Sequence, residues 1–376
     1  MNKQLQKIMI HINSLGKGGA ERVASLLASR FVQENVDVVV ATEWTEEMEY
    51  EVDKRVRRVH AGLTPEQEKK GRLSKVKCRK DNLRQVILAE KPDVILSFCV
   101  KANYRAVQAA MGTKIPVIVS VRNDPKIFYT GKAKAFMNKF VLNRADGCVF
   151  QTDEAKEFFD QVLQKKSTII CNPVDEKYLK AERKATTKKI VFVGRLVEQK
   201  NPMLLVQAFE KVLEKYPEYQ LCLYGDNFED NRKEELLEYL KREDKKKIKA
   251  GVHFMGRSNN LEQEMADAAM FVLPSNYEGM PNALMEAMAM GLPVISTDCP
   301  CGGSRYWITP KVNGQLVPVK DADALARAME FYIQNPDKAE EMGRNAKERL
   351  KEATMEKVFL QWQQYILKVM KEQNNC

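Results

Sequence analysis

Residues 271–297 read FVLPSNYEGMPNALMEAMAMGLPVIST, and this stretch decides the fold class. It opens and closes with short apolar runs that predict buried strands, and its middle, residues 283–290, consists of good helix formers. Pro281 before that run and Gly291 after it match the residue preferences of helix starts and ends. Strand, helix and strand in close succession are typical of a parallel sheet covered by helices.

The same alternation of apolar runs and amphipathic stretches fills the whole chain. We therefore expect two doubly wound α/β domains, residues 1–172 and 189–354, joined by a polar linker at 173–188 and followed by a helix within 355–376. Domains of this kind bind ligands at the carboxyl ends of their strands. The expected strands are residues 8–12, 36–40, 57–60, 93–97, 117–121, 147–150 and 168–171 in the first domain, and 189–193, 220–224, 252–254, 270–273 and 293–296 in the second.

The basic charge of the chain is unevenly distributed. The 376 residues carry a formal net charge of +10. Residues 1–172 contain 30 Lys and Arg against 20 Asp and Glu, whereas the remainder contains 31 of each kind. The surplus therefore belongs to the first half, and we expect the two halves to meet different partners.

Cysteine usage and hydropathy predict a cytoplasmic protein. Most of the eight cysteines lie in apolar stretches, as reduced core thiols do, and Cys299 and Cys301 have neither a second pair nor a nearby histidine for zinc. The apolar run near the N-terminus is too short for a signal peptide, and no stretch approaches the ~20 apolar residues that span a bilayer. The cysteines are at positions 78, 99, 148, 171, 222, 299, 301 and 376.

Two carboxylates eight residues apart frame a predicted anion site. Glu278 should lie in a loop and Glu286 one turn into the following helix. The backbone N–H groups of residues 279–284 and the positive end of the helix dipole would then face an anion between them. A diphosphate with hydroxylated groups on both sides, as in a sugar nucleotide, fits this arrangement. The backbone positions concerned are Gly279, Met280, Pro281, Asn282, Ala283 and Leu284.

Two cations follow the first strand of the second domain, in the segment FVGRLVEQKNP (192–202). Arg195, after Gly194, could bind two phosphate oxygens at once, and Lys200 could add a point charge. Ordinary surface cations are the alternative interpretation. The Glu278–Glu286 segment in the same domain favours a diphosphate site.

The first strand of the chain leads into a glycine-rich turn. Gly16, Gly18 and Gly19 would allow a ligand to approach the backbone closely at a helix start. The spacing matches neither the dinucleotide fingerprint nor the Walker A motif. This signal is weak alone, and it matters because the turn would face the Arg195 and Lys200 site across a cleft.

Three polar residues, Arg122, Asn123 and Asp124, follow the strand expected at 117–121, and Pro125 stops the run. Their place at the carboxyl end of a strand suggests contact with a sugar or an acceptor. A capped turn, with Asp124 holding the next helix, is an equally good interpretation.

Several other patterns suggest a metal or hydrolytic site, but we interpret them as structural. Asp321 and Asp323 form a D-x-D sequence, yet they stand where aspartates would cap the helix expected at 321–333. The three histidines lie in or beside apolar strands, so we expect no metal and no histidine-centred triad. The position of Glu286 on a helix argues against a glycosidase pair.

Residues 69–84, KKGRLSKVKCRKDNLR, hold eight of the basic residues and a single acid. Apolar positions such as Leu73 and Val76 predict a basic amphipathic helix, and such helices lie on anionic membranes. A second basic and partly apolar segment is 131–140. A solvated helix face is the alternative, and we do not expect nucleic-acid binding because no recognition motif accompanies the charge.

These motifs together make the chain resemble the family-four retaining glycosyltransferases, which have GT-B architecture. The resemblance covers nearly the whole chain and rests on FVGRLVEQKNP, on the two spaced glutamates within residues 271–297, and on GKGGAERV in the first loop. It implies two Rossmann-like domains that face each other across a cleft, with a C-terminal helix that crosses back. It also implies metal-independent transfer of a hexose or N-acetylhexosamine, without a cofactor.

The resemblance also implies roles for individual residues. Arg195 and Lys200 match the pair that neutralises the donor diphosphate, and Glu286 matches the carboxylate that binds the ribose. Glu278 matches the carboxylate near the donor hexose, so the catalytic candidates are Arg195, Lys200 and Glu278. The donor would be a UDP-sugar, and the acceptor a glycan or a polyprenyl-diphosphate-linked sugar at the inner face of the cell membrane. The remaining donor contacts would come from Gly16, Gly18, Gly19, Gly194 and the 279–284 backbone.

Two departures from the family pattern concern substrate choice. Many relatives carry a histidine after the strand matching 117–121, where this chain has Arg122-Asn123-Asp124, a pattern similar to a subgroup of surface-polysaccharide enzymes. Arg305 and Tyr306 stand where that subgroup commonly has a glutamate. The donor sugar, the acceptor, the linkage and the oligomeric state are left open.

Other functions on the same fold are alternatives. A sugar-nucleotide epimerase would need its own acid–base residues, and a phosphorylase would need a cofactor lysine. A non-catalytic nucleotide-sugar-binding subunit would neither hydrolyse nor transfer the donor sugar. A nicotinamide dehydrogenase fits the alternation of strands and helices but lacks the dinucleotide fingerprint.

Overall fold

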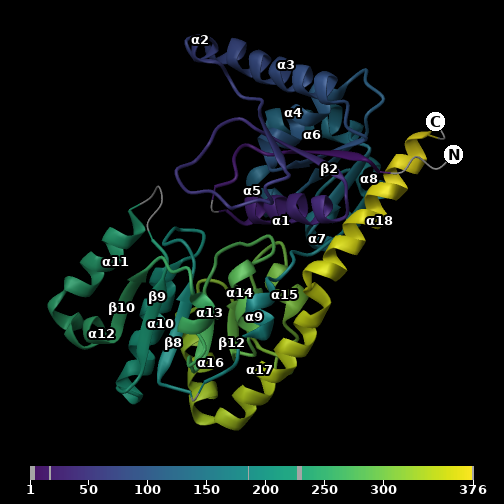
Figure 1. Cartoon of the computed structure of the whole chain (residues 1–376). Coiled ribbons are helices and arrows are strands. Elements are labelled where there is room, and N and C mark those ends of the chain that lie inside the picture. Colours follow the sequence, from purple (N-terminus) through teal and green to yellow (C-terminus); the bar gives the residue numbers. More distant parts are fainter. Residues whose placement is uncertain (1–4, 17, 185, 227–230, 375–376) are drawn as a thin grey trace. The chain divides into compact units, whose positions relative to one another are not determined.

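The computed structural model describes residues 5–16, 18–184, 186–226 and 231–374. Within these ranges the chain divides into two compact units (Figure 1). The first comprises Met1–Asn172 with Glu356–Cys376, and the second comprises Pro173–Met355. Cys376 and Lys17 lie outside the described residues.

The first unit is built on a seven-stranded parallel sheet with the order β3-β2-β1-β4-β5-β6-β7. The central strands are apolar on both faces because helices cover both sides. The strands are β1 (Lys7–His11), β2 (Asp37–Thr42), β3 (Arg57–His60), β4 (Val94–Phe98), β5 (Val117–Ser120), β6 (Gly147–Phe150) and β7 (Ser167–Ile169). The helices are α1 (Gly19–Gln33), α2 (Pro65–Glu68), α3 (Arg72–Glu90), α4 (Val100–Ala110), α5 (Pro125–Phe128), α6 (Lys132–Phe140), η1 (Leu142–Arg144), α7 (Asp153–Glu157) and α8 (Gln161–Lys165).

The second unit is built on a six-stranded parallel sheet with the order β10-β9-β8-β11-β12-β13. The strands are β8 (Lys189–Val193), β9 (Gln220–Tyr224), β10 (Val252–Gly256), β11 (Met270–Leu273), β12 (Val294–Thr297) and β13 (Gln315–Val317). The helices are α9 (Glu176–Lys180), α10 (Pro202–Lys215), α11 (Arg232–Lys241), η2 (Glu243–Lys245), α12 (Lys246–Gly251), α13 (Leu261–Glu264), α14 (Asn282–Ala289), α15 (Gly303–Trp307), α16 (Ala322–Gln334), α17 (Pro336–Leu350) and η3 (Lys351–Ala353).

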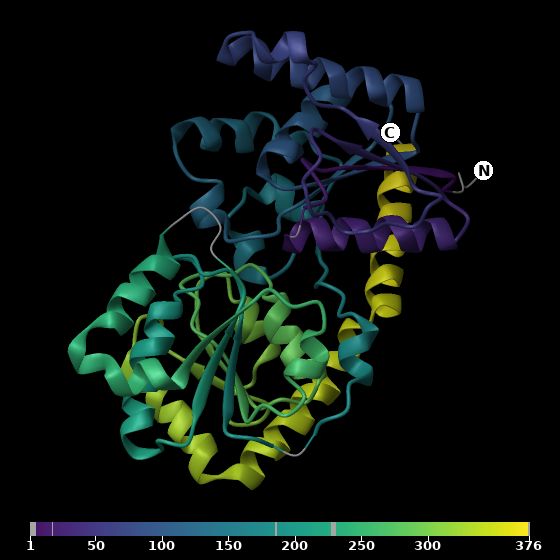
Figure 2. The same ribbon diagram turned by 60° about the vertical axis from the view of Figure 1, so that its left-hand side comes forward.

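The last helix, α18 (Met355–Asn374), returns to the first unit from Glu356 onward (Figure 2). Phe359 packs against Phe31 of α1 with ring centroids 4.7 Å apart, and Trp362 lies 5.8 Å from Phe98 at the end of β4. The Tyr365 hydroxyl accepts a hydrogen bond of 2.8 Å from the Cys148 N–H in β6. These contacts make α18 part of the hydrophobic core of the first unit.

The expected fold class is confirmed, since both units are parallel sheets covered by helices and the C-terminal helix crosses back. The prediction omitted β13, which pairs with β12. Residues 173–188, expected as a linker, count with the second unit and contain α9, whose Tyr178 is buried.

Candidate functional site

The loop after β11 and the start of α14 form the centre of the candidate site in the second unit. Glu278 lies in the loop and Glu286 lies one turn into α14, and both are almost fully buried, with 4% and 5% exposure. Pro281 is the residue before the helix, and no side chain caps the first turn. The N–H groups of a first helical turn lack acceptors within the helix, so this end of α14 favours an anion.

Lys200 and Glu278 form a nearly buried ion pair at the edge of this loop. The Lys200 Nζ lies 2.5 Å from Glu278 Oε1, and the two side chains are only 15% and 6% exposed. Ser275 Oγ donates to the same carboxylate oxygen at 2.6 Å. An ammonium has three N–H donors, so Lys200 can hold Glu278 and still donate to a phosphate oxygen.

Gly194 and Arg195 follow β8 directly and share the loop that carries Lys200. A Cβ atom at Gly194 would lie 3.5 Å from the Lys200 Cδ, so the lysine stem passes over the glycine. At Gly225, which has a φ of +130°, a Cβ would lie 1.9 Å from the Gly194 carbonyl oxygen, so the ends of β8 and β9 approach too closely for any side chain. The Arg195 side chain is exposed, whereas Lys200 is not.

The backbone of residues 279–281 is held from behind by α15. A Cβ at Gly303 would lie 1.8 Å from the Gly279 carbonyl oxygen, so this position admits only glycine. The indole nitrogen of Trp307 lies 2.8 Å from the Met280 sulfur. The backbone that leads into α14 is therefore fixed before any ligand arrives. Arg305, in the same helix, pairs with Asp298 at 2.7 Å.

The glycine-rich turn lies in the first unit, where β1 leads into α1. Gly19 begins the helix and Gly18 is its N-cap residue, with no side chain capping the first turn. Gly16 forms a bridge to Glu49. The carboxylate of Glu21 occupies the space beside Gly18, where a Cβ would lie 2.1 Å from Glu21 Oε2.

Arg122 is half-buried where β5 ends, in the same unit. Its guanidinium donates to Asn172 Oδ1 and to Ser120 Oγ at 3.4 Å, and it lies 5.9 Å from the centre of the Phe98 ring. Burial lowers the pKa of Arg122 to about 10, which leaves it charged at neutral pH. A half-buried cation at a strand end is suited to bind an anionic or hydroxylated ligand.

Asn123 and Asp124 have local structural partners. Asp124 Oδ1 accepts the Lys126 N–H at 2.9 Å and so caps α5. Asn123 Oδ1 accepts the Asp124 N–H at 2.9 Å. The capped turn that the sequence offered as an alternative is thus present at Asp124.

The D-x-D sequence has structural partners as well. Asp321 Oδ1 accepts the Ala324 N–H at 2.8 Å and caps α16. Asp323 pairs with Lys211 at 2.5 Å. Within the residues that the structure describes, no three His, Cys, Asp or Glu side chains gather as a metal ion would require.

The structure brings together two further groups of polar residues that the sequence motifs did not predict. In the second unit these are Gln199, Asn201 and Asn276, whose amides join the Lys200 loop to the Glu278 loop. In the first unit, Glu43 is 2% exposed and pairs with Arg105 of α4 and, at 3.0 Å, with Arg79 of α3. For Gln199, Asn201 and Asn276, the only indication in the sequence was that Asn201 follows Lys200, a predicted functional lysine.

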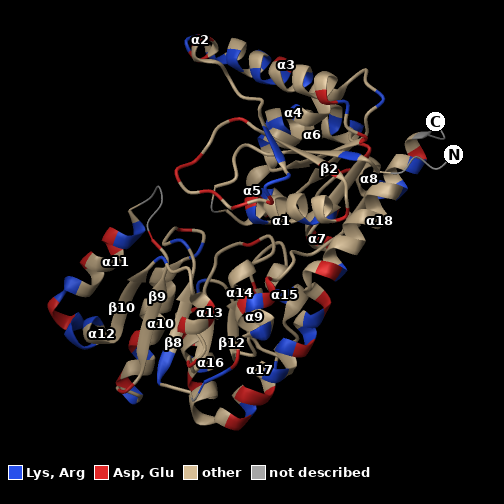
Figure 3. Ribbon diagram, viewed as in Figure 1, with Lys and Arg blue, Asp and Glu red and all other residues tan. Residues whose placement is uncertain are grey.

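The basic helix expected from residues 69–84 is α3, which begins at Arg72. Its apolar residues fall into two groups, since Leu83 and Ile87 are buried while Leu73 and Val76 are 86% and 60% exposed. Figure 3 shows Lys and Arg along this helix. A hollow of about 440 Å³ lies beside its first turns and is lined by Lys70, Arg72, Lys75, Val76, Arg79 and Lys101. In the described part of the chain, no helix combines the length and apolar character needed to cross a bilayer.

Two family models match the chain. The model described as Glycosyltransferase Family 4 matches residues 17–178, and the one described as Glycosyl transferases group 1 matches residues 174–349. Together they cover Gly18 and Gly19 of the glycine-rich turn, Arg122, the Lys200 loop and α14.

Similar proteins come from several organisms. The chain is 25% identical over 375 residues to the GalNAc-α-(1→4)-GalNAc-α-(1→3)-diNAcBac-PP-undecaprenol α-1,4-N-acetyl-D-galactosaminyltransferase of Campylobacter jejuni, with 97% of this chain and 99% of that protein covered. It is 29% identical over 268 residues to an uncharacterized glycosyltransferase of Methanocaldococcus jannaschii, with 64% of this chain and 63% of that protein covered.

Among solved structures, HepE of Anabaena in complex with UDP has the same fold, with a TM-score of 0.79 and 16% identity over 96% of this chain and 99% of that one. The two sheets, the returning C-terminal helix and the two family models agree with one another. The chain belongs to the glycosyltransferases of family four and has GT-B architecture.

Proposed function

We propose that this chain is a retaining, metal-independent glycosyltransferase that moves a hexose or N-acetylhexosamine from a UDP-sugar to a lipid-linked or growing polysaccharide acceptor. The observation that carries the proposal is the nearly buried Lys200–Glu278 pair beside the uncapped start of α14. A fixed cation and a helix N-terminus at one loop suit a diphosphate leaving group.

The donor roles follow from the placement of the residues in the second unit. Arg195, Lys200 and the first-turn N–H groups of α14 would bind the diphosphate. Glu286 would accept hydrogen bonds from the ribose hydroxyls, and Glu278 would lie near the transferred hexose. We assign Gly16, Gly18 and Gly19 to donor contacts as well, and Arg122 and Asn123 to the acceptor or sugar.

The chemical step would proceed on one face of the sugar. The bond between C1 and the β-phosphate oxygen breaks while the acceptor oxygen forms a new bond to C1, and the acceptor proton moves to the departing phosphate. Negative charge then grows on the β-phosphate. Lys200 and Arg195 stabilise that charge most in the transition state, which is the condition for catalysis.

The nature of the relatives supports the choice of acceptor. The Campylobacter jejuni relative is named for an undecaprenyl-diphosphate-linked acceptor, and HepE was crystallised with UDP. A family member with these similarities is a candidate for the same classes of donor and acceptor. No observation favours the epimerase or the non-catalytic subunit.

A transfer assay tests this proposal. Purified protein is incubated with UDP-, GDP- and ADP-sugars and a polyprenyl-diphosphate-linked sugar, with and without EDTA. We expect transfer from one UDP-sugar, unchanged by EDTA, and an α-linked product by NMR. Failure to transfer or hydrolyse any sugar nucleotide would contradict the proposal, and loss of activity with EDTA would contradict its metal-independent part.

We also propose that α3 attaches the protein to the inner face of an anionic membrane. Leu73 and Val76 are exposed among the cations, and on α6 the rings of Phe136 and Phe140 are also exposed, 4.5 Å apart. Cations with exposed apolar side chains are the combination that binds anionic lipid surfaces. Each cation near the surface contributes about 1 kcal/mol.

Vesicle sedimentation tests this attachment. We expect binding to vesicles that contain phosphatidylglycerol and not to pure phosphatidylcholine vesicles, and weaker binding by the double variant Arg72→Glu/Lys77→Glu, which changes two exposed cations of α3. The control variant Lys368→Glu changes a cation on α18. Equal binding by the double variant and wild type would contradict a role for α3.

A further inference from the structure

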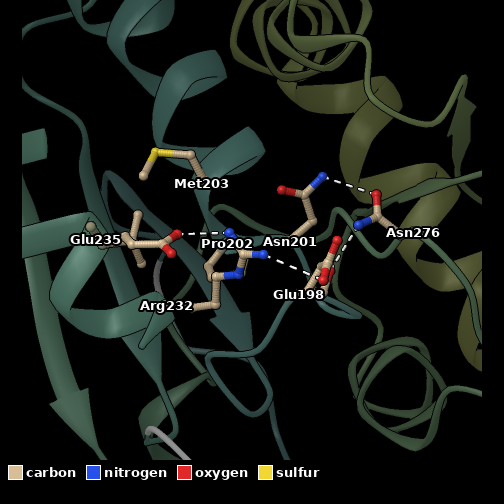
Figure 4. A pocket seen from close by; sticks show the side chains of 8 residues that line it. Glu198, Asn201, Pro202, Met203, Arg232, Glu235 and Asn276 are labelled. Carbon is tan, nitrogen blue, oxygen red and sulfur yellow. Dashed lines mark hydrogen bonds and ion pairs between the residues drawn. The ribbon is translucent and has the colours of Figure 1, made fainter. Parts of the chain in front are cut away.

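The two loops that carry Lys200 and Glu278 are joined by an asparagine that the proposed chemistry does not use. The Asn276 N–H donates to the Gln199 carbonyl oxygen at 2.8 Å. Its side-chain Nδ2 donates to the Glu198 carbonyl oxygen at 2.8 Å, and its Oδ1 accepts from Asn201 Nδ2 at 3.0 Å. One residue thus binds the chain on both sides of Lys200 (Figure 4).

A second amide adds to the same junction. Gln199 Nε2 donates to the Tyr277 carbonyl oxygen at 3.1 Å and lies 3.5 Å from Glu278 Oε2. The junction therefore links residues 198, 199 and 201 to residues 276, 277 and 278. Lys200 and Glu278 stand opposite each other within it, at 2.5 Å.

Asn201 is itself held in one conformation. Its backbone is left-handed, with a φ of 45°, and its Oδ1 accepts the Leu204 N–H at 3.3 Å to cap α10. Asparagine adopts this backbone conformation more readily than most residues. With Oδ1 fixed by the cap, Nδ2 can only point away from the helix, toward Asn276. The bond between the two amides therefore ties the helix start to the Glu278 loop.

A small hollow lies beside this junction. It measures about 120 Å³, and the residues that line it include Asn201, Asn276, Glu198, Arg232 and Glu235. Arg232 pairs there with Glu198 at 3.3 Å and with Glu235 at 2.7 Å. Water could enter if the Asn276 side chain were removed, and the Glu198 carbonyl would then be hydrated instead of being bound to the loop.

We propose that Asn276 is a positioning residue that sets the Lys200 ammonium against Glu278 and the donor diphosphate. It acts through Lys200 and does not itself touch the substrate. This inference rests on the proposed function. A misplacement of about 1 Å in a catalytic group can cost about 10²-fold in rate, so a residue that fixes the Lys200 loop can matter without contacting the ligand.

The variant Asn276→Ala removes both side-chain bonds and keeps the backbone bond to Gln199. We expect kcat to fall about 10- to 100-fold while the Kd for UDP changes less than about 3-fold, since most donor contacts remain. Asn345→Ala is the matched control, because Asn345 also donates one side-chain hydrogen bond to a backbone carbonyl, that of Val312 at 2.9 Å. That control should keep the wild-type kcat.

A double-mutant cycle decides whether Asn276 acts through Lys200. In a Lys200→Ala background, Asn276→Ala should cost less than about 2-fold, because the group that it positions is gone. Equal fold losses in both backgrounds would overturn the inference, and so would an unchanged kcat in the single variant. Asn276→Asp keeps the size and the acceptor oxygen but sets a carboxylate oxygen against the Glu198 carbonyl in place of the donor. The kcat should therefore fall in this variant as well, and an unchanged kcat would overturn the inference even if the alanine variant does not fold.

The wild-type protein separates this inference from the proposed function. If the wild type transfers no sugar from any nucleotide donor, the proposed function fails and the inference fails with it. If the wild type is active and the cycle is additive, only the role of Asn276 is wrong.

Discussion

Two buried carboxylates, one in each unit, have different partners, and only one of them has a partner that can also bind a ligand. Glu43 in the first unit is held between Arg105 and Arg79, guanidiniums from two helices. Glu278 in the second unit has one cation, Lys200, and a hydroxyl from Ser275. The cluster around Glu43 is closed by its own partners, whereas Lys200 keeps donors that a ligand can use. A buried ion pair is thus found both at a structural site and at a candidate catalytic site. The difference is that the cation of the candidate catalytic site has N–H donors left for a ligand.

The largest expected effect is a loss of turnover when the Lys200–Glu278 pair is changed. Lys200→Ala should lower kcat by at least about tenfold and up to about 10³-fold, as the loss of one donor to a developing anion does elsewhere. Arg195→Ala should act in the same direction. Steady-state transfer rates check this. Near wild-type rates for both variants would remove the basis of the diphosphate site.

Removing Glu43 from its cluster should lower the stability of the protein. Glu43→Ala leaves the nearly buried Arg105 without its carboxylate, whereas Arg79 still pairs with Glu68 at 3.4 Å, so we expect the free energy of unfolding to fall by about 3 kcal/mol. Urea denaturation followed by circular dichroism measures the change. The kcat per folded molecule should stay within about 2-fold of wild type. A large loss of kcat without a loss of stability would show that the Glu43 cluster is catalytic and not structural.

The pH dependence of stability sharpens the contrast further. His11 in β1 donates from Nδ1 to the Ala41 carbonyl at 3.0 Å and lies beside Arg105, and burial together with that charge lowers its pKa to about 3. A depressed histidine pKa favours the neutral folded state, so its contribution is full above pH 6.5 and is lost as the pH falls from 6.5 toward 3.

The expected slope is about 1.4 kcal/mol per pH unit, superimposed on the titration of other groups. The comparison with His11→Gln isolates it, since this variant cannot titrate. Melting temperatures of the two proteins at pH 7, 6, 5 and 4 provide the measurement. Parallel curves would show that the His11 pKa is not depressed.

The smallest effect is expected at the exposed pair of Asp323 and Lys211. Asp323→Asn should leave the melting temperature and kcat unchanged, because the pair is exposed to solvent. The same assay with added Mn²⁺ examines the D-x-D sequence as a metal site. Metal stimulation in the wild type that this variant abolishes would contradict the structural interpretation.

Periodicity predicted the strands well where they are continuous and apolar. The expected strands 189–193 and 220–224 have the same bounds as β8 and β9. β13 was missed because its three residues, QLV, are short and begin with a polar side chain. Helix end preferences placed Glu278 in the loop and Glu286 in α14, since that information is local.

Long-range polar contacts lie beyond such reasoning. Asn276 contacts Asn201 across 75 positions of sequence, and Glu43, directly after β2, pairs with Arg105 of α4. A single sequence does not indicate which amides or charged side chains pair, because pairing depends on the tertiary structure. The amide junction and the closed cluster could therefore be found only in the structure.

The return of α18 to the first unit has a consequence for synthesis of the protein in the cell. Phe359 and Trp362 complete the packing around Phe31 and Phe98, yet they are translated after the entire second unit. A nascent chain that has passed residue 355 still exposes the apolar surface that these rings will cover. A chain that stops between residues 355 and 359 lacks both rings, so we expect chaperones to bind it and proteases to degrade it.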